Sequence, residues 1–445
     1  MAVLRAVLIG VLALGGSSLH AAATAVLPAL QVDGNVLKTT ATRKQVDLKG
    51  ASWFGFNVDT GMVDGLWAGI DLATTSAQLK LLGFNTLRIP FDFSLLKAPA
   101  SDFRWAGCMR KDIVNNTLDP RLAKAKVGRT LRPRPPGTLP PVPPLSPPGM
   151  CNSYVPRTGA VEELLLWTVE FFVAQGFYVM LNHHSLVSGD QIQRNPSDFA
   201  NAWARLWGKL AAKKQFQARL LGRVFVDITN EPDFMGMKWS DRPDMIGATE
   251  MYLRVMDRLH AITPRGMLYF VEGTGQTSYG LCWGNGFVTD TAIVAKHGID
   301  DASPFFRRLV RRPYVGQVVI SPHEYGPTIR KTHLTTRELE ERMNASYGYL
   351  MTRGFCHAGA CTKFPVVVGE FGSDMGAEDM GFLTDFGRWM RRQASNSWVI
   401  WAVNANSGDT GGLFDKTLWQ DVRWDKVRYL VEGGLGLRPW WKEGS

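Results

Sequence analysis

The 445-residue sequence predicts an α/β protein, a (β/α)8 (TIM) barrel in which eight parallel strands alternate with helices. Three observations lead to this fold class. Short apolar runs rich in Val, Ile and Leu recur eight times, segments with helical spacing of apolar residues separate most of them, and polar side chains follow nearly every run. Strand–helix alternation produces a parallel sheet, so eight units predict a barrel whose functional site lies at the carboxyl ends of its strands.

The chain begins with a predicted signal peptide, residues 1–25. Arg5 supplies a positive start, an apolar run follows, and the alanines at 21–25 supply cleavage sites. The run is too short to span a bilayer, and no later stretch is apolar over a sufficient length. We therefore expect a secreted, extracellular protein that is free of the membrane after signal removal, with residues 26–445 forming a single catalytic domain.

The first elements of that domain are predicted to be a short β-hairpin around Asp33 and Gly34, which closes one end of the barrel together with residues 45–49. A helix capped by Asp71 or Thr74 follows the first strand and ends at Gly83. The eight predicted strands span 51–57, 84–90, 177–184, 224–229, 267–271, 316–320, 366–368 and 398–402. The later predicted helices include 161–174, 203–210, 251–262, 336–352 and 382–394.

A loop insertion, residues 94–158, interrupts this rhythm after the second strand, and its 132–149 portion is rich in proline. So much proline is incompatible with a helix or an inner strand, which predicts an extended, disordered insertion within one loop. An arm that binds the cell wall is the alternative.

The net charge of +10 and the pI near 9.4 come without a long Lys/Arg run, so we expect an ordinary basic surface and no nucleic-acid partner. We expect a monomer. The 15 Trp residues suggest exposed stacking platforms as well as core. Trp53, Trp167, Trp203 and Trp207 are assigned to the core, whereas for Trp239 and Trp283 core and platform remain equally open.

Five cysteines are available for disulfides in an exported protein. Cys356 and Cys361 bracket a short loop that a bridge would close, and Cys108 and Cys151 flank the proline-rich segment. Cys282 is then left over. Zinc bound by Cys356, His357 and Cys361 is the alternative, although no second ligand pair stands at metal spacing.

Two of the predicted strands each end in a glutamate. Residues 223–233 run from a buried strand into Asn230, Glu231 and Pro232, and residues 364–373 deliver Glu370 in the same way. Two carboxylates presented by the ends of two buried strands meet the requirement of glycoside hydrolysis.

With these residues in place, the chain resembles glycoside hydrolase family 5, the cellulase and mannanase family, over about residues 29–430 apart from the insertion. The Asn230-Glu231-Pro232 motif after the fourth strand matches the family's acid/base, and Glu370 at the seventh matches its nucleophile. The resemblance also implies substrate-binding or supporting roles for Arg88, His184, Asn230, His323, Tyr325 and Trp401. His183 is the alternative to His184, and Glu324, between His323 and Tyr325, is read as structural.

The chemistry of this set is consistent with a retaining enzyme, whose carboxyl groups lie about 5–5.5 Å apart. Arg88 and the Tyr325 hydroxyl are expected to stabilise the ionised Glu370, while the negative Glu370 raises the pKa of Glu231 so that it holds a proton. We expect no metal and no other cofactor. His183 and His184 are adjacent on a strand and point to opposite faces, which argues against one ion bound by both.

These inferences predict a secreted endo-β-1,4-glucanase (a cellulase) that acts on polysaccharide by double displacement. Within the same family, an endo-β-1,4-mannanase is the runner-up, followed by a β-1,3-glucanase or a β-glucosidase-like enzyme. Two alternatives come from other classes: an inactive barrel that binds carbohydrate, and a metal-dependent barrel hydrolase.

Overall fold

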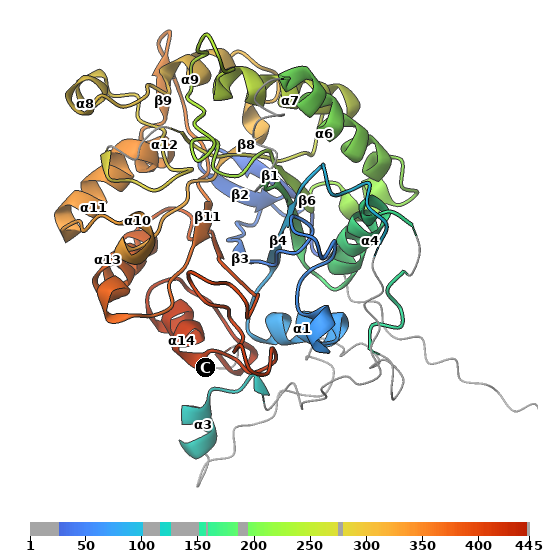
Figure 1. Cartoon of the computed structure of the whole chain (residues 1–445). Coiled ribbons are helices and arrows are strands. Elements are labelled where there is room, and N and C mark those ends of the chain that lie inside the picture. Colours follow the sequence, from blue (N-terminus) through green and yellow to red (C-terminus); the bar gives the residue numbers. More distant parts are fainter. Residues whose placement is uncertain are drawn as a thin grey trace, which may run out of the picture.

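The computed structural model describes residues 26–100, 116–125, 151–156, 159–185, 195–274 and 279–442. Within them, one eight-stranded parallel sheet has the strand order β11-β12-β3-β4-β5-β6-β7-β8, and helices surround it (Figure 1). Parallel bridges from Ile320 to Val366 and from His323 to Glu370 join the two ends of this order, so the sheet closes on itself. The predicted (β/α)8 barrel is confirmed. Its strands are β3 Lys49–Ser52, β4 Thr86–Phe91, β5 Tyr178–His183, β6 Val224–Asp227, β7 Tyr269–Val271, β8 Val318–Ile320, β11 Val368–Phe371 and β12 Trp398–Ile400.

The helices follow the predicted order, with one interruption. Asp71 is the cap of the first, because its carboxylate accepts a hydrogen bond from the Thr74 N–H. The helix predicted over 336–352 is divided by a π turn at Asn344–Gly348. The α-helices of the described residues are α1 Leu72–Leu81, α3 Pro120–Ala125, α4 Val161–Ala174, α6 Pro196–Ala211, α7 Ala248–Ile262, α8 Thr291–His297, α9 Ser303–Leu309, α10 Pro327–Arg330, α11 Thr336–Met343, α12 Tyr349–Thr352, α13 Met380–Arg391 and α14 Trp424–Glu432.

Side chains alternate along each strand, so those that point into the barrel form an inner core and those that point outward form an outer core. In β5, Met180 belongs to the inner core, whereas Val179 and Leu181 pack in the outer core with the surrounding helices. The predicted hairpin is present as β1 Leu30–Asp33 and β2 Val36–Thr39, and its leucines join the inner core. The hairpin therefore closes the amino-terminal end of the barrel.

The first strand is shorter than predicted, because it stops at Ser52 instead of continuing to residue 57. Gly55 explains the early end. Its φ of 145° is strained for residues with a side chain, and a Cβ there would lie 1.9 Å from the Met62 carbonyl oxygen. The loop after β3 therefore folds back closely on itself above the strand.

Parts of the predicted insertion 94–158, including residues 116–125 and 151–156, lie among the described residues. Asp119 is buried and accepts hydrogen bonds from the Arg428 guanidinium on α14. The Trp440 indole donates to the Thr117 hydroxyl at 3.1 Å. The segment 116–120 therefore packs against the carboxyl-terminal part of the chain. The proline-rich residues 132–149 and the predicted signal peptide lie outside the described residues.

The cysteines follow the predicted pattern where the structure describes them. Cys356 and Cys361 form a disulfide that joins β9 Phe355–His357 to β10 Ala360–Thr362, which removes the zinc alternative because both thiols are consumed. Cys282 is buried and free. Cys151 takes part in a disulfide, and Cys108, its predicted partner, lies outside the described residues. None of the helices described here combines the length and the apolar character that a membrane span needs.

Candidate active site

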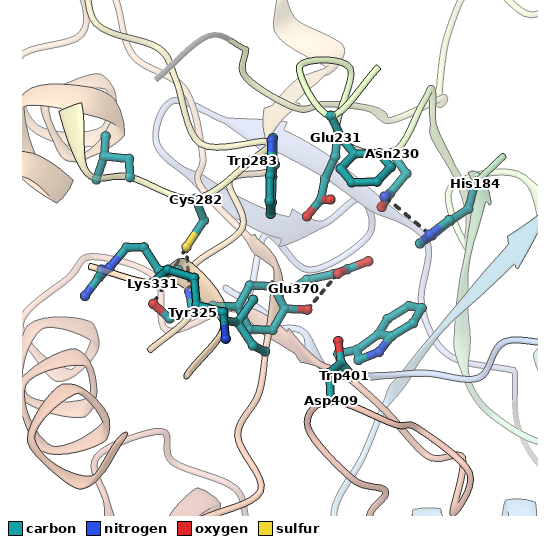
Figure 2. Close-up of a pocket in the computed structure, with 14 residues that line it drawn as sticks. His184, Asn230, Glu231, Cys282, Trp283, Tyr325, Lys331, Glu370, Trp401 and Asp409 are labelled. Carbon is teal, nitrogen blue, oxygen red and sulfur yellow. Dashed lines mark hydrogen bonds between the residues drawn. The ribbon is translucent and has the colours of Figure 1, made fainter. Parts of the chain in front are cut away.

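The predicted site residues converge on one cavity of about 530 Å³ at the carboxyl ends of the strands. Figure 2 shows Glu231 and Glu370 directed toward the same space, with Trp283 and Trp401 flanking them. Arg88 and His323 lie beneath the cavity floor and are fully buried. The structure therefore brings together all eight predicted site residues; those that line the cavity are His184, Asn230, Glu231, Tyr325, Glu370 and Trp401.

Each carboxylate oxygen of Glu370 is contacted by a neighbouring side chain. The Arg88 guanidinium contacts Oε1, and the Tyr325 hydroxyl donates to Oε2 at 2.7 Å. Arg88 stands on β4 and Glu370 on β11, so the barrel closure brings together residues that are far apart in the sequence. The cation and the hydroxyl both stabilise the ionised carboxylate, which is the form a nucleophile requires.

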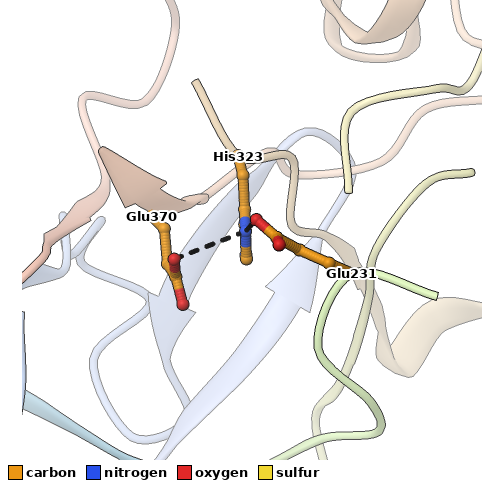
Figure 3. A group of neighbouring side chains, drawn as sticks. All are labelled: Glu231, His323 and Glu370. Carbon is orange, nitrogen blue, oxygen red and sulfur yellow. Dashed lines mark hydrogen bonds and ion pairs between the residues drawn. The ribbon is translucent and has the colours of Figure 1, made fainter. Parts of the chain in front are cut away.

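Glu231 lies on the other side of His323. His323 Nδ1 is 2.9 Å from Glu231 Oε1 and 3.6 Å from Glu370 Oε2, so the ring lies between the two carboxyl groups (Figure 3). Burial would lower the pKa of His323, but the charges of Glu272 and Glu370 and the hydrogen bond to Glu231 raise it well above its ordinary value. The imidazole therefore holds a proton between the two glutamates.

Asn230 connects Arg88 to His184. Its side-chain oxygen accepts from Arg88 Nη2 at 2.8 Å, and its Nδ2 lies 3.4 Å from His184 Nε2. Burial, assisted by the Arg88 charge, lowers the pKa of His184 to about 3, so this ring is neutral and can accept that hydrogen bond. The Trp401 ring stacks on His184 at a centroid distance of 5.5 Å and on Phe54 at 5.4 Å.

The choice between His183 and His184 is resolved by the two faces of β5. His183 points away from the cavity and packs between Phe93 and Phe199, with ring centroids 5.1 and 5.0 Å away. Burial lowers its pKa to about 4. His184 is the histidine of the cavity, and His183 is a core residue.

Sequence reasoning missed two acidic residues, Asp227 and Glu272, that complete the buried part of the site. Asp227 Oδ2 accepts from Arg88 Nε at 2.8 Å, and Glu272 Oε1 accepts from Arg88 Nη2 at 3.1 Å. Burial raises the pKa of both Asp227 and Glu272, whereas the positive charges of Arg88 and His323 oppose this shift and favour the ionised carboxylates.

Strand parity is the signal that could have found these two residues. Asp227 stands two positions after Phe225, and Glu272 two positions after Phe270; both phenylalanines belong to the inner core. Because side chains alternate along a strand, each carboxylate must point into the barrel one step above that core.

The aromatic side chains divide into platform and core. Trp283 is 37% exposed and Phe234 is 60% exposed; their rings meet edge to face at 5.4 Å on the cavity wall. Trp239 is instead fully buried against Phe305, and its indole donates to the Gly286 carbonyl. Of the two tryptophans left open by the sequence, Trp283 faces the cavity and Trp239 belongs to the core.

In the described residues, one group of side chains could supply ligands to a metal ion. The side chains of Glu231, His323 and Glu370 offer ligand atoms within 4.8 Å of one another. The raised pKa of His323 keeps a proton on the imidazole that a metal ligand would have to lose. The donor set therefore fits acid–base chemistry better than metal binding.

Comparison with known proteins agrees with this geometry. The family description "Cellulase (glycosyl hydrolase family 5)" matches residues 160–407, more than half of the chain. The major extracellular endoglucanase of Xanthomonas campestris pv. campestris is 23% identical over 396 residues, which cover 87% of this chain and 67% of that protein. An endoglucanase of Paenibacillus polymyxa is 22% identical over 407 residues, with coverages of 87% and 84%.

Solved structures have the same fold. The endocellulase of Pyrococcus horikoshii, crystallised with cellotetraose, superposes with a TM-score of 0.60 at 21% identity and covers 91% of this chain and 98% of its own. The family match, which spans the strands that carry Glu231 and Glu370, shows that the chain is a glycosyl hydrolase and belongs to glycosyl hydrolase family 5, the cellulase family.

Proposed function

We propose that the protein is a secreted endo-β-1,4-glucanase that hydrolyses its substrate with retention of anomeric configuration. The observation that carries the mechanism is the spacing of the two glutamates: an oxygen of Glu231 and one of Glu370 lie within 4.8 Å of each other. Retaining glycosidases place these groups about 5–5.5 Å apart, whereas inverting enzymes leave about 6.5–9.5 Å for a water. The substrate is inferred from the relatives, which are named endoglucanases.

In the first step, the ionised Glu370 attacks the anomeric carbon from one face of the sugar ring. The bond to the leaving oxygen breaks as Glu231 gives that oxygen its proton, which leaves a glycosyl ester on Glu370 and an ionised Glu231. Arg88 and the Tyr325 hydroxyl, which hold Glu370 before the attack, orient its carboxylate toward the cavity.

In the second step, water replaces the first product. Glu231 removes a proton from this water, the water oxygen attacks the anomeric carbon, and the ester bond to Glu370 breaks. Both carboxyl groups return to their starting protonation states. His323, protonated and 2.9 Å from Glu231, stabilises the ionised Glu231 that exists between the two steps.

The sugar that undergoes attack is expected to stack on Trp401, with Asn230 near its 2-hydroxyl. Asn230 is oriented for this contact because Arg88 and His184 hold the two ends of its amide. A polar contact to the 2-hydroxyl strengthens in the transition state of glycoside hydrolysis. Trp283 and Phe234 offer a second apolar surface for a neighbouring sugar.

Secretion is supported by residues 1–25 and by the relative described as extracellular. The test of this location is the amino-terminal sequence of the protein recovered from the culture medium. Cleavage after Ala23 or Ala25 is expected, and retention of the full amino terminus inside the cell would refute it.

The activity is tested by incubation with cellulose, mixed-linkage glucan, glucomannan and mannan, with sizing of the products. Internal cleavage of the glucans is expected, and the first product resolved by proton NMR should be the β-anomer. Initial release of the α-anomer would refute double displacement, and cleavage of mannan alone would refute the glucanase assignment. Glu370→Ala should abolish turnover, whereas Glu378→Gln, at an exposed glutamate in the 3-10 turn Ala377–Asp379, should not.

A further inference from the structure

Glu272 directly follows β7 and lies beneath Glu231. Its side chain is fully buried and does not line the cavity. Its two carboxylate oxygens nevertheless reach Glu231 by two separate routes, one through the backbone and one through His323. Neither route is visible in the sequence motifs.

The first route holds the backbone of Glu231. Glu231 has a φ of 38°, in the left-handed region that residues with a side chain seldom occupy. Its N–H donates to Glu272 Oε2 at 2.6 Å. In this backbone conformation the Glu231 N–H has a carboxyl acceptor, so Glu272 favours the strained turn that directs the Glu231 carboxyl into the cavity.

The second route passes through an imidazole. His323 Nε2 lies 3.3 Å from Glu272 Oε1, and His323 Nδ1 lies 2.9 Å from Glu231 Oε1. Glu272, His323 and Glu231 therefore form a carboxyl–imidazole–carboxyl series. A carboxylate on one ring nitrogen orients the ring and stabilises its protonated form, which is the form that faces Glu231.

Glu272 is itself held in place. The Tyr252 hydroxyl donates to its backbone carbonyl at 2.9 Å, and Arg88 Nη2 lies 3.1 Å from Oε1. Gly284 packs directly against it, since a Cβ there would lie 3.1 Å from Glu272 Oε2 and 3.2 Å from the His323 ring. A carboxylate held in this way can position its neighbours.

We propose that Glu272 is a positioning residue for the acid/base Glu231, which acts by fixing the Glu231 backbone through Oε2 and the His323 ring through Oε1. This proposal rests on the proposed role of Glu231. It predicts that the loss of Glu272 impairs proton donation to the leaving group more than nucleophilic attack by Glu370.

The test is Glu272→Gln, which keeps the size of the side chain but presents an NH2 group to donors on Arg88, His323 or Glu231. Its kcat/KM is measured on two substrates. The phenol leaving group of phenyl β-cellobioside needs a proton, whereas the 2,4-dinitrophenolate leaving group of 2,4-dinitrophenyl β-cellobioside does not. A fall of about 100-fold on the first and of less than about tenfold on the second is expected. Equal losses on both substrates, or no loss on either, would overturn the proposal.

Glu324→Gln is the matched control. Glu324 is also fully buried and carries an ion pair to Arg330; among the residues that the structure describes, its side-chain partners are Arg330, Asn285 and Tyr347, not Glu231. Its replacement should change both substrates by the same factor. If Glu272→Gln fails to fold, Glu272→Asp retains the charge with a shorter reach and should show the same unequal loss at smaller amplitude; equal losses again overturn the proposal.

A second measurement is independent of the substrate. In protein with isotope-labelled histidine, NMR titration should show a lower midpoint for His323 in Glu272→Gln than in the wild type, with the exposed His333 unchanged. An unchanged His323 midpoint would overturn the route through the imidazole. If the wild type hydrolyses neither cellobioside, the proposed function fails while this titration still decides the role of Glu272.

Discussion

Arg88→Lys is the substitution for which the structure makes the sharpest stability prediction. The Arg88 side chain is fully buried, and its three nitrogens contact four residues on three different strands or their ends: Asp227, Asn230, Glu272 and Glu370. A guanidinium can serve these acceptors at once because its donors spread in a planar fork. A lysine ammonium carries the same charge at a single point on a different stem.

The expected magnitude follows from the acceptors that lose their donor. The ammonium can approach some of the carboxylates, so at least one buried carboxylate is left without a cation. Removing one partner of a buried ion pair costs about 3–5 kcal/mol. We expect Arg88→Lys to lower the free energy of unfolding by about 3 kcal/mol and Arg88→Met by more. Both variants should also lower kcat, because the guanidinium no longer orients the Glu370 carboxylate.

Urea denaturation and the measurement of kcat test the two effects. Arg254→Lys is the matched control, since Arg254 pairs with Glu250 on the surface of α7 with its side chain 44% exposed. Exposed pairs contribute about 0–1 kcal/mol, so the control should remain near the wild type. If the unfolding free energy of Arg88→Lys lies within about 1 kcal/mol of the wild-type value and its kcat is unchanged, the reasoning about the buried network is wrong.

Three further predictions concern pH, metals and the sugar platform. Because burial holds the pKa of His183 near 4, this residue stabilises the fold fully above about pH 6.5 and loses that effect as the pH falls toward 4. In His183→Phe, the free energy of unfolding should rise between pH 5 and 7 less steeply than in the wild type, by up to about 1.4 kcal/mol per pH unit. Equal slopes in the two proteins would contradict this. Activity should persist in excess chelator, whereas a loss restored by one divalent metal would support a metal enzyme. Trp401→Ala should raise the KM for cello-oligosaccharides roughly tenfold with the fold intact, and an unchanged KM would argue against a platform.

The barrel and the positions of the two glutamates could be predicted from local patterns. Each strand is a short apolar run with its own turn residues, so eight runs and their spacing are sufficient to indicate a parallel barrel. Glu231 and Glu370 each stand directly after such a run, and their meeting follows from the rule that the carboxyl ends of parallel strands share one face. Strand limits were less accurate, since the close approach of Gly55 to Met62 ends β3 early.

Contacts across the barrel could not be predicted in this way, because they depend on which face each side chain occupies and on which strands close the sheet. His183 and His184 are equivalent in sequence, and the packing of one among phenylalanines separates them. Trp239 and Trp283 both stand in loops, but the Trp239 ring is buried against Phe305 of α9, whereas Trp283 lies on the cavity wall and is partly exposed. Asp227 and Glu272 became site residues only when the barrel placed Arg88 and His323 against them. A local pattern can place a carboxylate at a strand end, but its partners come from distant strands that meet only when the barrel closes.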